Sequence, residues 1–326
     1  MSRLSYQIPN FTYPDTAPAD LFPTVVAQAR EAEAAGFDRV MVMDHFYQLP
    51  GIGEPDEPML ECYTTLAALA QHTERVRLSA LVTGNSYRNP ALLAKTVTAL
   101  DHVSGGRATL GIGAGWFELE HDALGFEFGT FTDRFEKLEE ALQIIVGMLR
   151  GDRPTVSGDH YSVTDALNSP APLSSIPVMI GGNGERKTLR LVARYADESN
   201  LMGMGGDVDV ARKLAVLAQH CEHEGRDPSE IAVTMLVGCV VAPSAKELDS
   251  DLRAMAAAKG WGDGVIDMVK QILICGDADT VGQRLGELAA SGVTGLVCNL
   301  PVNGHVPGRI SLMAEVADRA LTAAGR

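Results

Sequence analysis

Positive charge is scarce in this sequence. Of its 326 residues, 27 are Lys or Arg and 42 are Asp or Glu, which gives a formal net charge of −15 at pH 7. Nucleic acids and anionic membranes repel a surface with this excess of acidic groups unless a local basic patch intervenes. We therefore expect neither nucleic acid nor a membrane among the partners of this protein.

Long apolar runs and paired cysteines are missing as well. No apolar stretch approaches the roughly 18 residues of a membrane span, and the N-terminal residues do not form the hydrophobic segment of an export signal. The five cysteines are scattered and include no CxxC pair, so the sequence indicates neither a disulfide framework nor a zinc site. We expect a cytoplasmic protein without a metal ion.

The sequence does contain a regular alternation of short apolar runs and longer amphipathic segments. Apolar runs predict eight strands, at residues 4–11, 39–43, 76–82, 107–112, 177–180, 198–202, 231–241 and 294–300. Helical periodicity predicts helices at 20–35, 60–73, 91–103, 134–149, 185–195, 208–224, 245–259, 265–274, 280–291 and 310–323. Residues 151–175 are rich in Pro and Gly, which indicates an insertion.

The alternation of strands and helices implies a parallel sheet. Eight such units fit a closed (β/α)8 TIM barrel. The alternative is a doubly wound open sheet, which normally carries a glycine-rich turn after its first strand. Residues 9–14 (PNFTYP) contain no glycine. We predict a single α/β barrel domain over residues 1–326, with its insertion at about 151–175.

The active site of a (β/α)8 barrel lies at the C-terminal ends of its strands. Asp44 and His45 follow the second strand, the polar segment 83–90 follows the third, and Trp116 follows the fourth after glycine-rich residues 113–115. Glycines let a ligand approach the backbone, and an indole offers a stacking surface. Two plainer interpretations remain open: a capping pair at Asp44 and His45, and a core or dimer aromatic at Trp116.

The fifth strand runs into the glycine-rich segment 181–188 (GGNGERKT), directly before a helix. Glycines ahead of a helix N-terminus present free N–H groups to an anion, and Arg186 and Lys187 add positive charge. The spacing is neither that of a P-loop nor that of a GxGxxG turn. The segment therefore predicts a phosphate site, with an ordinary βα turn as the alternative.

Several segments resemble the motifs of one known family. They are residues 37–46 (FDRVMVMDHF), 64–70 (TTLAALA), 81–90 (LVTGNSYRNP), 100–107 (LDHVSGGR), 110–116 (LGIGAGW), 180–184 (IGGNG) and 191–197 (LVARYAD). Together they resemble the bacterial luciferase-like family, particularly its branch that uses the deazaflavin coenzyme F420. The resemblance extends from residue 4 to about residue 205.

This resemblance implies a (β/α)8 barrel in which a deazaflavin or flavin lies across the strand ends. It places Asp44 and His45 beside the reactive face of the ring as the catalytic residues, with His45 in the proton-transfer role. It also implies a non-proline cis peptide at Ala80–Leu81. Trp116 is expected at the substrate. The implied cofactor contacts are Asp44, Ala80, Leu81, Thr83, Asn85, Gly113, Ala114 and Gly115 near the ring, and Gly181, Gly182, Asn183, Gly184 and Arg186 near the phosphate.

One position departs from the family pattern. In the branch that acts on sugar phosphates, a catalytic glutamate follows the fourth strand. Here Trp116 stands near that place, and the carboxylate of Glu118 comes later. This departure argues against a sugar phosphate as the substrate.

We therefore expect a deazaflavin-dependent oxidoreductase that moves a hydride between F420 and a small, mostly apolar organic substrate, and we expect a homodimer. One alternative is a monooxygenase that uses reduced FMN and oxygen, and another is a non-catalytic flavin-binding protein. Arg186, Lys187 and Arg190 are expected on one helix, with Arg186 and Arg190 on a common face. A cationic face of this kind favours F420, because that cofactor carries a long acidic tail.

Overall fold

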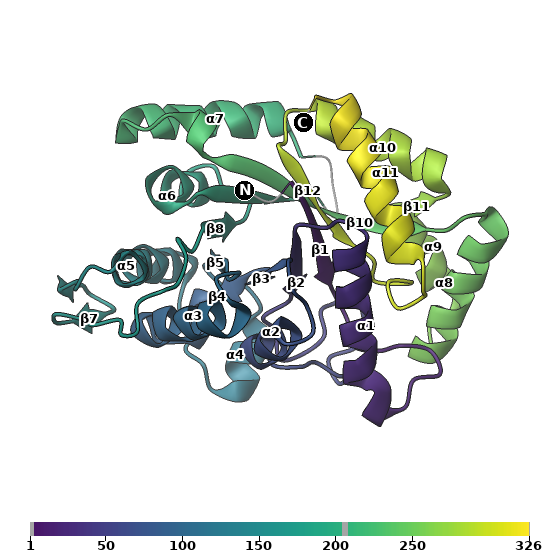
Figure 1. The fold of residues 1–326 in the computed structure, drawn as a ribbon, viewed down its shortest axis with the longest axis horizontal. Coiled ribbons are helices and arrows are strands. Elements are labelled where there is room, and N and C mark those ends of the chain that lie inside the picture. Colours follow the sequence, from purple (N-terminus) through teal and green to yellow (C-terminus); the bar gives the residue numbers. More distant parts are fainter. Residues whose placement is uncertain (1–2, 204–207, 326) are drawn as a thin grey trace.

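The computed structural model describes residues 3–203 and 208–325, and its centre is a barrel of parallel strands (Figure 1). Eight strands of the described residues form the barrel wall. They are β1 (Leu4–Ile8), β2 (Arg39–Val42), β3 (Arg77–Ala80), β5 (Leu110–Gly113), β8 (Val178–Gly181), β9 (Glu198–Met202), β10 (Ala232–Val241) and β12 (Gly295–Asn299). The short strand β4 (Thr83–Gly84) follows β3 and pairs with β5, and β11 (Ile274–Gly276) pairs with the end of β10.

The strands close into a ring. β1 pairs with both β2 and β12, and the order continues through β10, β9 and β8 to β5. Between β3 and β5 the ring is completed by two backbone hydrogen bonds, from the Leu78 N–H to the Arg107 carbonyl (2.9 Å) and from the Thr109 N–H to the Leu78 carbonyl (3.0 Å). The predicted (β/α)8 barrel is confirmed.

Helices surround the barrel on its outside (Figure 1). They are α1 (Leu21–Ala34), α2 (Cys62–Ala70), α3 (Pro90–Ser104), α4 (Glu118–Leu124), α5 (Phe131–Arg150), α6 (Thr188–Tyr195), α7 (Val210–Glu224), α8 (Ala245–Lys259), α9 (Asp263–Ile272), α10 (Ala278–Ala290) and α11 (Arg309–Ala323). Short 3-10 turns lie at η1 (Pro18–Asp20), η2 (Asn85–Tyr87) and η3 (Pro228–Glu230). No helix of the described residues is long and apolar enough to cross a membrane.

Local sequence signals begin and end several of these helices. The Asn89 side chain accepts hydrogen bonds from the first backbone N–H groups of α3, and Pro90 occupies the first helical position, where no N–H is needed. Thr130 and Asp133 form a reciprocal capping box at the start of α5. Gly151 ends α5 in the left-handed conformation, with a φ of 86°.

Residues 151–175 leave the barrel as an excursion. Their strands β6 (Val156–Ser157) and β7 (Ser162–Val163) pair only with each other, and Figure 1 shows the hairpin at the left edge of the molecule. The Glu140 carboxylate of α5 accepts the N–H groups of Asp159, His160 and Tyr161 at 2.8–3.0 Å. This carboxylate fastens the hairpin to the helix.

Most of the apolar core lies in two layers. The larger one lies between the barrel wall and the helices. The smaller one fills the barrel interior with Met41, Leu81, Met179, Leu236 and Val297, which come from different strands or strand ends. Side chains of alternate strands fill the interior of such barrels in the same way.

A charged pair lies inside the barrel near the beginning of its strands. Both guanidinium NH2 groups of Arg39 donate to Glu198, at 2.9 and 2.7 Å, and the side chains are 1% and 4% exposed. Ser5 accepts the third donor of Arg39, and the Thr234 hydroxyl donates to Glu198. Both charged groups of this pair therefore have partners within the protein.

The local details differ from the expectations in several helical segments, and three of these lie near the strand ends. Helix α4 was not predicted, because seven residues are too few to display a helical period. Helix α6 begins at Thr188 rather than at residue 185, since residues 185–187 form a turn. The helix expected over 265–274 ends at Ile272, and the chain continues directly into β11.

The cis peptide lies one bond later than the family pattern implied. It joins Leu81 to Val82, whereas the expected position was Ala80–Leu81. The Leu81 N–H still donates to the Val42 carbonyl at 2.9 Å, so the chain follows β2 through this residue before it turns.

Candidate active site

A cavity of about 490 Å³ opens at the C-terminal ends of the barrel strands. Residues at or just after the strand ends line it, among them Gln7, Met43, Gly113, Gly181 and Asn299. The site therefore lies where a (β/α)8 barrel brings residues from many strands together.

His45 lies on the cavity wall just after β2. Its Nδ1 atom is 2.9 Å from a carboxylate oxygen of Glu120, and its ring meets those of Trp116 and Phe117 edge-on, at 5.8 Å between centroids. Among the described residues Nδ1 has this partner and Nε2 has none. The arrangement fixes the imidazole ring and leaves Nε2 for a molecule in the cavity.

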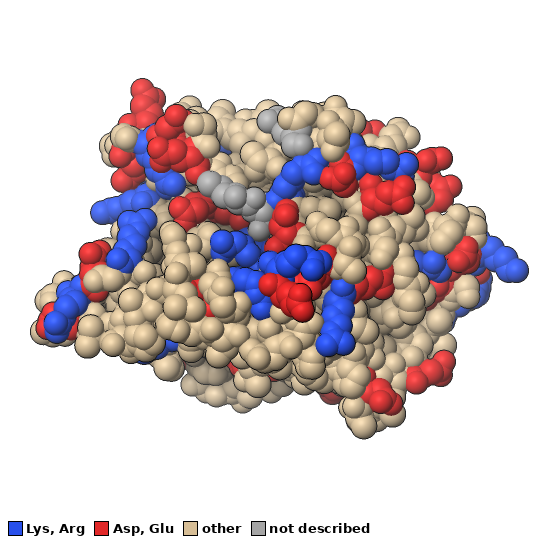
Figure 2. Space-filling view, in the orientation of Figure 1, with Lys and Arg blue, Asp and Glu red and all other residues tan. Residues whose placement is uncertain are grey.

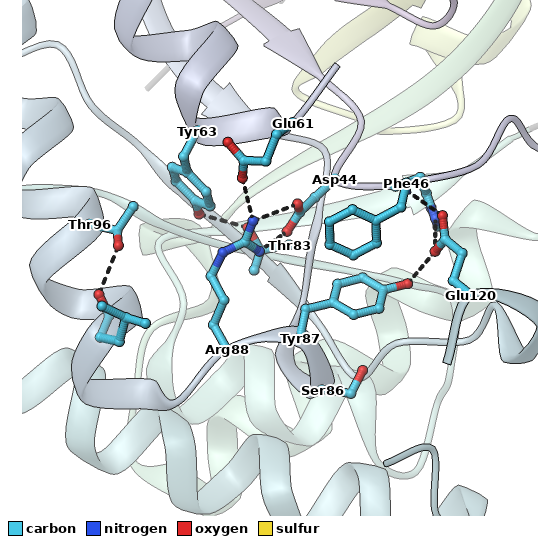
Figure 3. A network of polar contacts seen from close by, with 12 residues as sticks. Asp44, Phe46, Glu61, Tyr63, Thr83, Ser86, Tyr87, Arg88, Thr96 and Glu120 are labelled. Carbon is cyan, nitrogen blue, oxygen red and sulfur yellow. Dashed lines mark hydrogen bonds and ion pairs between the residues drawn. The ribbon is translucent and has the colours of Figure 1, made fainter. Parts of the chain in front are cut away.

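Glu120 comes from the unpredicted helix α4 and is fully buried. Besides His45, it accepts the N–H groups of Phe46 (2.5 Å) and Tyr47 (2.8 Å) and the hydroxyl of Tyr87 (2.5 Å; Figure 3). Burial alone would raise the pKa of the Glu120 carboxyl, but the hydrogen bond and charge of His45, together with the hydrogen bonds of Tyr87 and Tyr47, lower this pKa below its usual value. The structure thus holds Glu120 as a carboxylate behind the histidine.

Sequence reasoning missed Glu120 and considered Glu118 instead. Glu118 is exposed, whereas Glu120, two residues later, reaches the site. The segment after the fourth strand therefore does send a carboxylate to His45. Trp116 still stands near the place of the family's glutamate, and the exclusion of a sugar phosphate stays a prediction. No sequence signal separates the two glutamates, since α4 is too short to show which of its faces is buried.

Asp44 is held by a different partner. The guanidinium of Arg88 contacts both of its carboxylate oxygens, at 2.5 and 3.0 Å, and also contacts Glu61 at 2.7 Å (Figure 3). Burial raises the pKa of Asp44, and the charge and hydrogen bonds of Arg88 oppose this by stabilising the carboxylate. Arg88 also lies 4.9 Å from the ring centre of Tyr63. The arginine of segment 83–90 therefore positions Asp44 at the edge of the cavity.

Thr83 belongs to the same network. Its hydroxyl is 2.7 Å from that of Tyr63, which lies on α2 beside Arg88 (Figure 3). Thr83 and Asp44 both line the cavity. Their orientation is thus set by residues that do not line the cavity themselves.

The glycines at the strand ends make room for the protein as well as for a ligand. Val82 packs between β5 and β8, and a Cβ atom added at Gly113 or Gly181 would come within 3.0 Å of its methyl groups. At both positions a larger residue would push Val82 toward the cavity. Close packing of Val82 is therefore a second reason for glycine here, beside the expected approach of a ligand.

The structure brings most of the predicted site residues to one cavity. Those that line it are Asp44, His45, Leu81, Thr83, Gly113, Ala114, Gly115, Trp116, Gly181 and Gly182. Those that do not are Ala80, Asn85, Asn183, Gly184 and Arg186. Ala80 and Asn85 are buried, and the Asn183 amide is tied to the backbone of Met202 at 2.8 and 2.9 Å. The binding roles of all these residues stay predictions.

The expected cationic face beside the phosphate turn does not form. Arg186 lies in the turn before α6, so it is not one helical turn from Arg190 on the same helix. Arg190 instead forms an ion pair with Glu139 (2.5 Å), and the Lys187 ammonium lies over the rings of Phe131 and Phe135. On the face shown in Figure 2, basic side chains are interspersed with acidic ones.

Two cavity walls were not predicted. One is the loop 49–52. The other consists of Met268, Val269 and Ile272 of α9 and the following residue, Leu273. No described residue of the insertion at 151–175 lines the cavity. Its hairpin is hydrogen-bonded to Glu140 of α5, and its later residues Asn168, Ser169 and Ala171 are bonded to α3.

The lining is predominantly apolar. Trp116, Met202, Met268 and Ile272 line the cavity and are nevertheless 39–56% exposed, which places them at its mouth. Among the described residues, the lining contains no Lys or Arg, and no group of His, Cys, Asp and Glu could hold a metal ion. Exposed apolar side chains around a cavity mark a site for an apolar ligand.

Comparisons with known proteins agree with this geometry. A model of the luciferase-like monooxygenase family matches residues 4–295. The 5,10-methylenetetrahydromethanopterin reductase of Methanolobus tindarius is 27% identical over 336 residues, covering 91% of this chain and 96% of that protein. The F420-dependent glucose-6-phosphate dehydrogenase of Microbacterium testaceum is 35% identical over 209 residues, covering 63% of this chain and 60% of that protein.

A solved structure with a bound flavin shares the fold. The oxygenating constituent of 3,6-diketocamphane monooxygenase from Pseudomonas putida, in complex with FMN, superposes with a TM-score of 0.73 at 18% identity. The match covers 98% of this chain and 99% of that one.

Proposed function

The chain belongs to the luciferase-like monooxygenase family, and we propose that it is an oxidoreductase that transfers a hydride between coenzyme F420 and a small, mostly apolar organic substrate. The observation that carries this proposal is the placement of His45. Its ring is fixed through Nδ1 by the buried carboxylate of Glu120, and it lines the apolar cavity at the strand ends. A histidine held in this way can give or take a proton at Nε2 as a hydride moves to or from a neighbouring carbon.

The residues of the cavity fit a flat cofactor with a polar edge. Leu81, Val82 and Leu236 supply apolar wall, and residues 113–115 expose backbone free of bulky side chains. Asn299 lines the same cavity, and its buried Oδ1 atom has no hydrogen-bond partner among the described residues. When bound, the deazaflavin supplies the hydride-carrying carbon, while the protein binds, orients and excludes water.

The apolar lining supports a neutral substrate. An anionic group such as a phosphate is generally recognised by Arg or Lys, and the described lining contains neither. The described lining thus lacks the basic side chains that would bind a sugar phosphate, although the Glu120 carboxylate contacts His45.

The relative named as F420-dependent favours F420 over FMN, because it is 35% identical where it aligns. Arg186 is exposed beside the glycine turn and remains a candidate contact for the acidic tail of F420. FMN with oxygen is the second candidate, supported by the shared fold of the FMN-bound monooxygenase.

Cofactor titration of the purified chain tests the proposal. We expect F420 to bind, seen as a change in its absorbance and fluorescence, and FMN to bind at least about tenfold more weakly. Tight binding of FMN without binding of F420 would overturn the assignment and favour the monooxygenase. A bound cofactor that no reductant or substrate turns over would favour the non-catalytic flavin-binding protein. The homodimer expected from the sequence stays a prediction, which light scattering of the same sample checks.

A further inference from the structure

A buried ion pair joins two connections of the barrel that lie far apart in the sequence. Lys259 is the last residue of α8, and its side chain is fully buried against the carboxylate of Glu57, which is 12% exposed. The Thr12 hydroxyl donates to the same carboxylate at 2.8 Å. We call Lys259, Glu57 and Thr12 the latch.

Each side of the latch continues into a wall of the cavity. Glu57 belongs to the connection between β2 and α2, whose residues 49–52 line the cavity. Lys259 is followed by a short turn and then by α9, whose residues Met268 and Ile272 line the cavity as well. The latch therefore connects the two walls that sequence reasoning did not predict.

The second wall moves with Lys259 because α8 and α9 pack as one body. Leu252 and Met255 of α8 and Val269 of α9 share an apolar cluster with Val240 and Val302. In the figure α8 and α9 lie together at the right side of the molecule (Figure 1). A shift of α8 at Lys259 would accordingly displace the α9 wall.

The burial of the latch fixes the positions of its two charged side chains, Lys259 and Glu57. Burial lowers the pKa of Lys259, and the hydrogen bond and charge of Glu57 oppose this change. A buried charge is tolerated only with a well-placed partner, so the two side chains hold each other in position. Because Glu57 neutralises Lys259, this lysine is not available to attract an anionic substrate.

Gly53 leaves the space that the Glu57 carboxylate occupies. A Cβ atom at Gly53 would lie 2.2 Å from the Oε1 atom of Glu57, and the φ of Gly53 is not in the left-handed region. An alanine can therefore be introduced without backbone strain, and it must displace the carboxylate. The chain thus offers a way to open the latch without changing any charge.

We propose that the latch of Lys259, Glu57 and Thr12 sets the width of the cavity between residues 49–52 and α9, and so determines the size of substrate that the site admits. The inference rests on the proposed function, since it concerns the substrate of that same site. The three residues are positioning residues, because they act through the two walls.

Hydrogen–deuterium exchange of the full chain tests the mechanical part of this proposal. Gly53→Ala and the double variant Lys259→Met/Glu57→Gln should speed exchange at least about tenfold in residues 46–57 and in 263–273, with residues 117–128 unchanged. The matched controls are Gly286→Ala, at an open position inside α10, and Lys270→Met, at an exposed position of α9. Unchanged exchange in both latch variants would overturn the proposal.

A series of neutral 2-alkanones, from butanone upward, tests the effect on substrate size. Binding is measured as the shift in melting temperature, with and without F420. In the wild type, affinity should rise with chain length and then fall once the ketone exceeds the closed cavity. In both latch variants this limit should move to longer ketones, while the affinity for butanone stays within about twofold.

The outcomes separate the latch from the proposed function. If the ketones bind and the length limit is the same in all proteins, the latch does not determine substrate size, whatever the exchange shows. If no protein binds a ketone, the apolar substrate of the proposed function is wrong, and the exchange experiment alone decides the latch.

Discussion

The two ends of the barrel interior each hold a buried carboxylate beside a basic side chain, but they use it differently. At the N-terminal end of the strands, Glu198 and Arg39 satisfy each other, with Ser5 and Thr234 completing the set. At the C-terminal end, Glu120 holds only one nitrogen of His45.

This difference separates a structural pair from a reactive one. In the Arg39–Glu198 pair every guanidinium nitrogen and both carboxylate oxygens have a partner within the protein, so the pair serves the fold. In the pair at the cavity, Nε2 of His45 has no partner among the described residues, and His45 lines the cavity. Its partner Glu120 is fixed by four hydrogen bonds. Whether a charged pair serves stability or chemistry therefore depends on whether one of its polar atoms is left without a partner in the protein.

The largest expected effect concerns His45. His45→Phe keeps the bulk of the ring and removes the proton, so kcat for F420-dependent turnover should fall by about 10²–10⁴ while the Kd of the cofactor changes far less. Steady-state kinetics and a cofactor titration measure both quantities. The exposed His223 supplies the control variant His223→Phe. Near-full turnover with a markedly lower melting temperature would show that His45 is a core histidine and would remove the contrast between the two ends.

The second prediction concerns the Arg39–Glu198 pair at the N-terminal end of the strands. Arg39→Met leaves Glu198 buried without its counter-charge, so the free energy of unfolding should fall by about 3–5 kcal/mol. Chemical denaturation measures this loss. The double variant Arg39→Met/Glu198→Met should recover most of it, because both charges are then absent. Arg284→Met, which breaks an exposed pair with Glu287 on α10, should have no measurable effect. An equal loss in the single and double variants would contradict the assignment of Arg39–Glu198 as a coupled pair.

The third prediction concerns Glu120, which acts through His45. Glu120→Gln keeps the shape but removes the negative charge behind the imidazole, so kcat should fall by about tenfold to a hundredfold, with a smaller change in KM. Its control is Glu118→Gln, two residues earlier and exposed. The pH profile of kcat should also move in Glu120→Gln and not in the control. A variant with unchanged kcat and pH profile would show that Glu120 serves only the fold.

The smallest expected effect is a pH dependence of stability. The pKa of Glu120 is lower in the folded chain than its usual value of 4.5, so the unfolded chain binds the proton more readily. The stabilisation by Glu120 should be complete above about pH 4.5 and be lost as the pH falls through the lower pKa of the folded state. The difference in unfolding free energy between wild type and Glu120→Gln, measured by denaturation from pH 7 to about pH 3, should therefore shrink toward acid. A constant difference would contradict this sign.

Much of this protein could be read from local sequence patterns. The alternation of apolar runs and amphipathic segments depends on which face of each segment is buried, and that property repeats along the chain with the period of the element. It determined the eight strands and therefore the barrel, and the barrel determined that Asp44, His45, Gly113 and Trp116 would meet at one end.

Other features depend on contacts between residues that no local pattern relates. Glu120 lies 75 residues from His45, Glu57 lies 202 residues from Lys259, and Arg39 lies 159 residues from Glu198. A single glutamate in a short helix or loop has the same local appearance whether it faces solvent or a buried histidine. The sequence by itself thus determined the barrel and the ring of residues at its strand ends, whereas only the tertiary packing decided which carboxylate holds His45 and which walls close the cavity. The physical reason is that periodicity reports the burial of one element, while pairing depends on how separate elements are placed against one another.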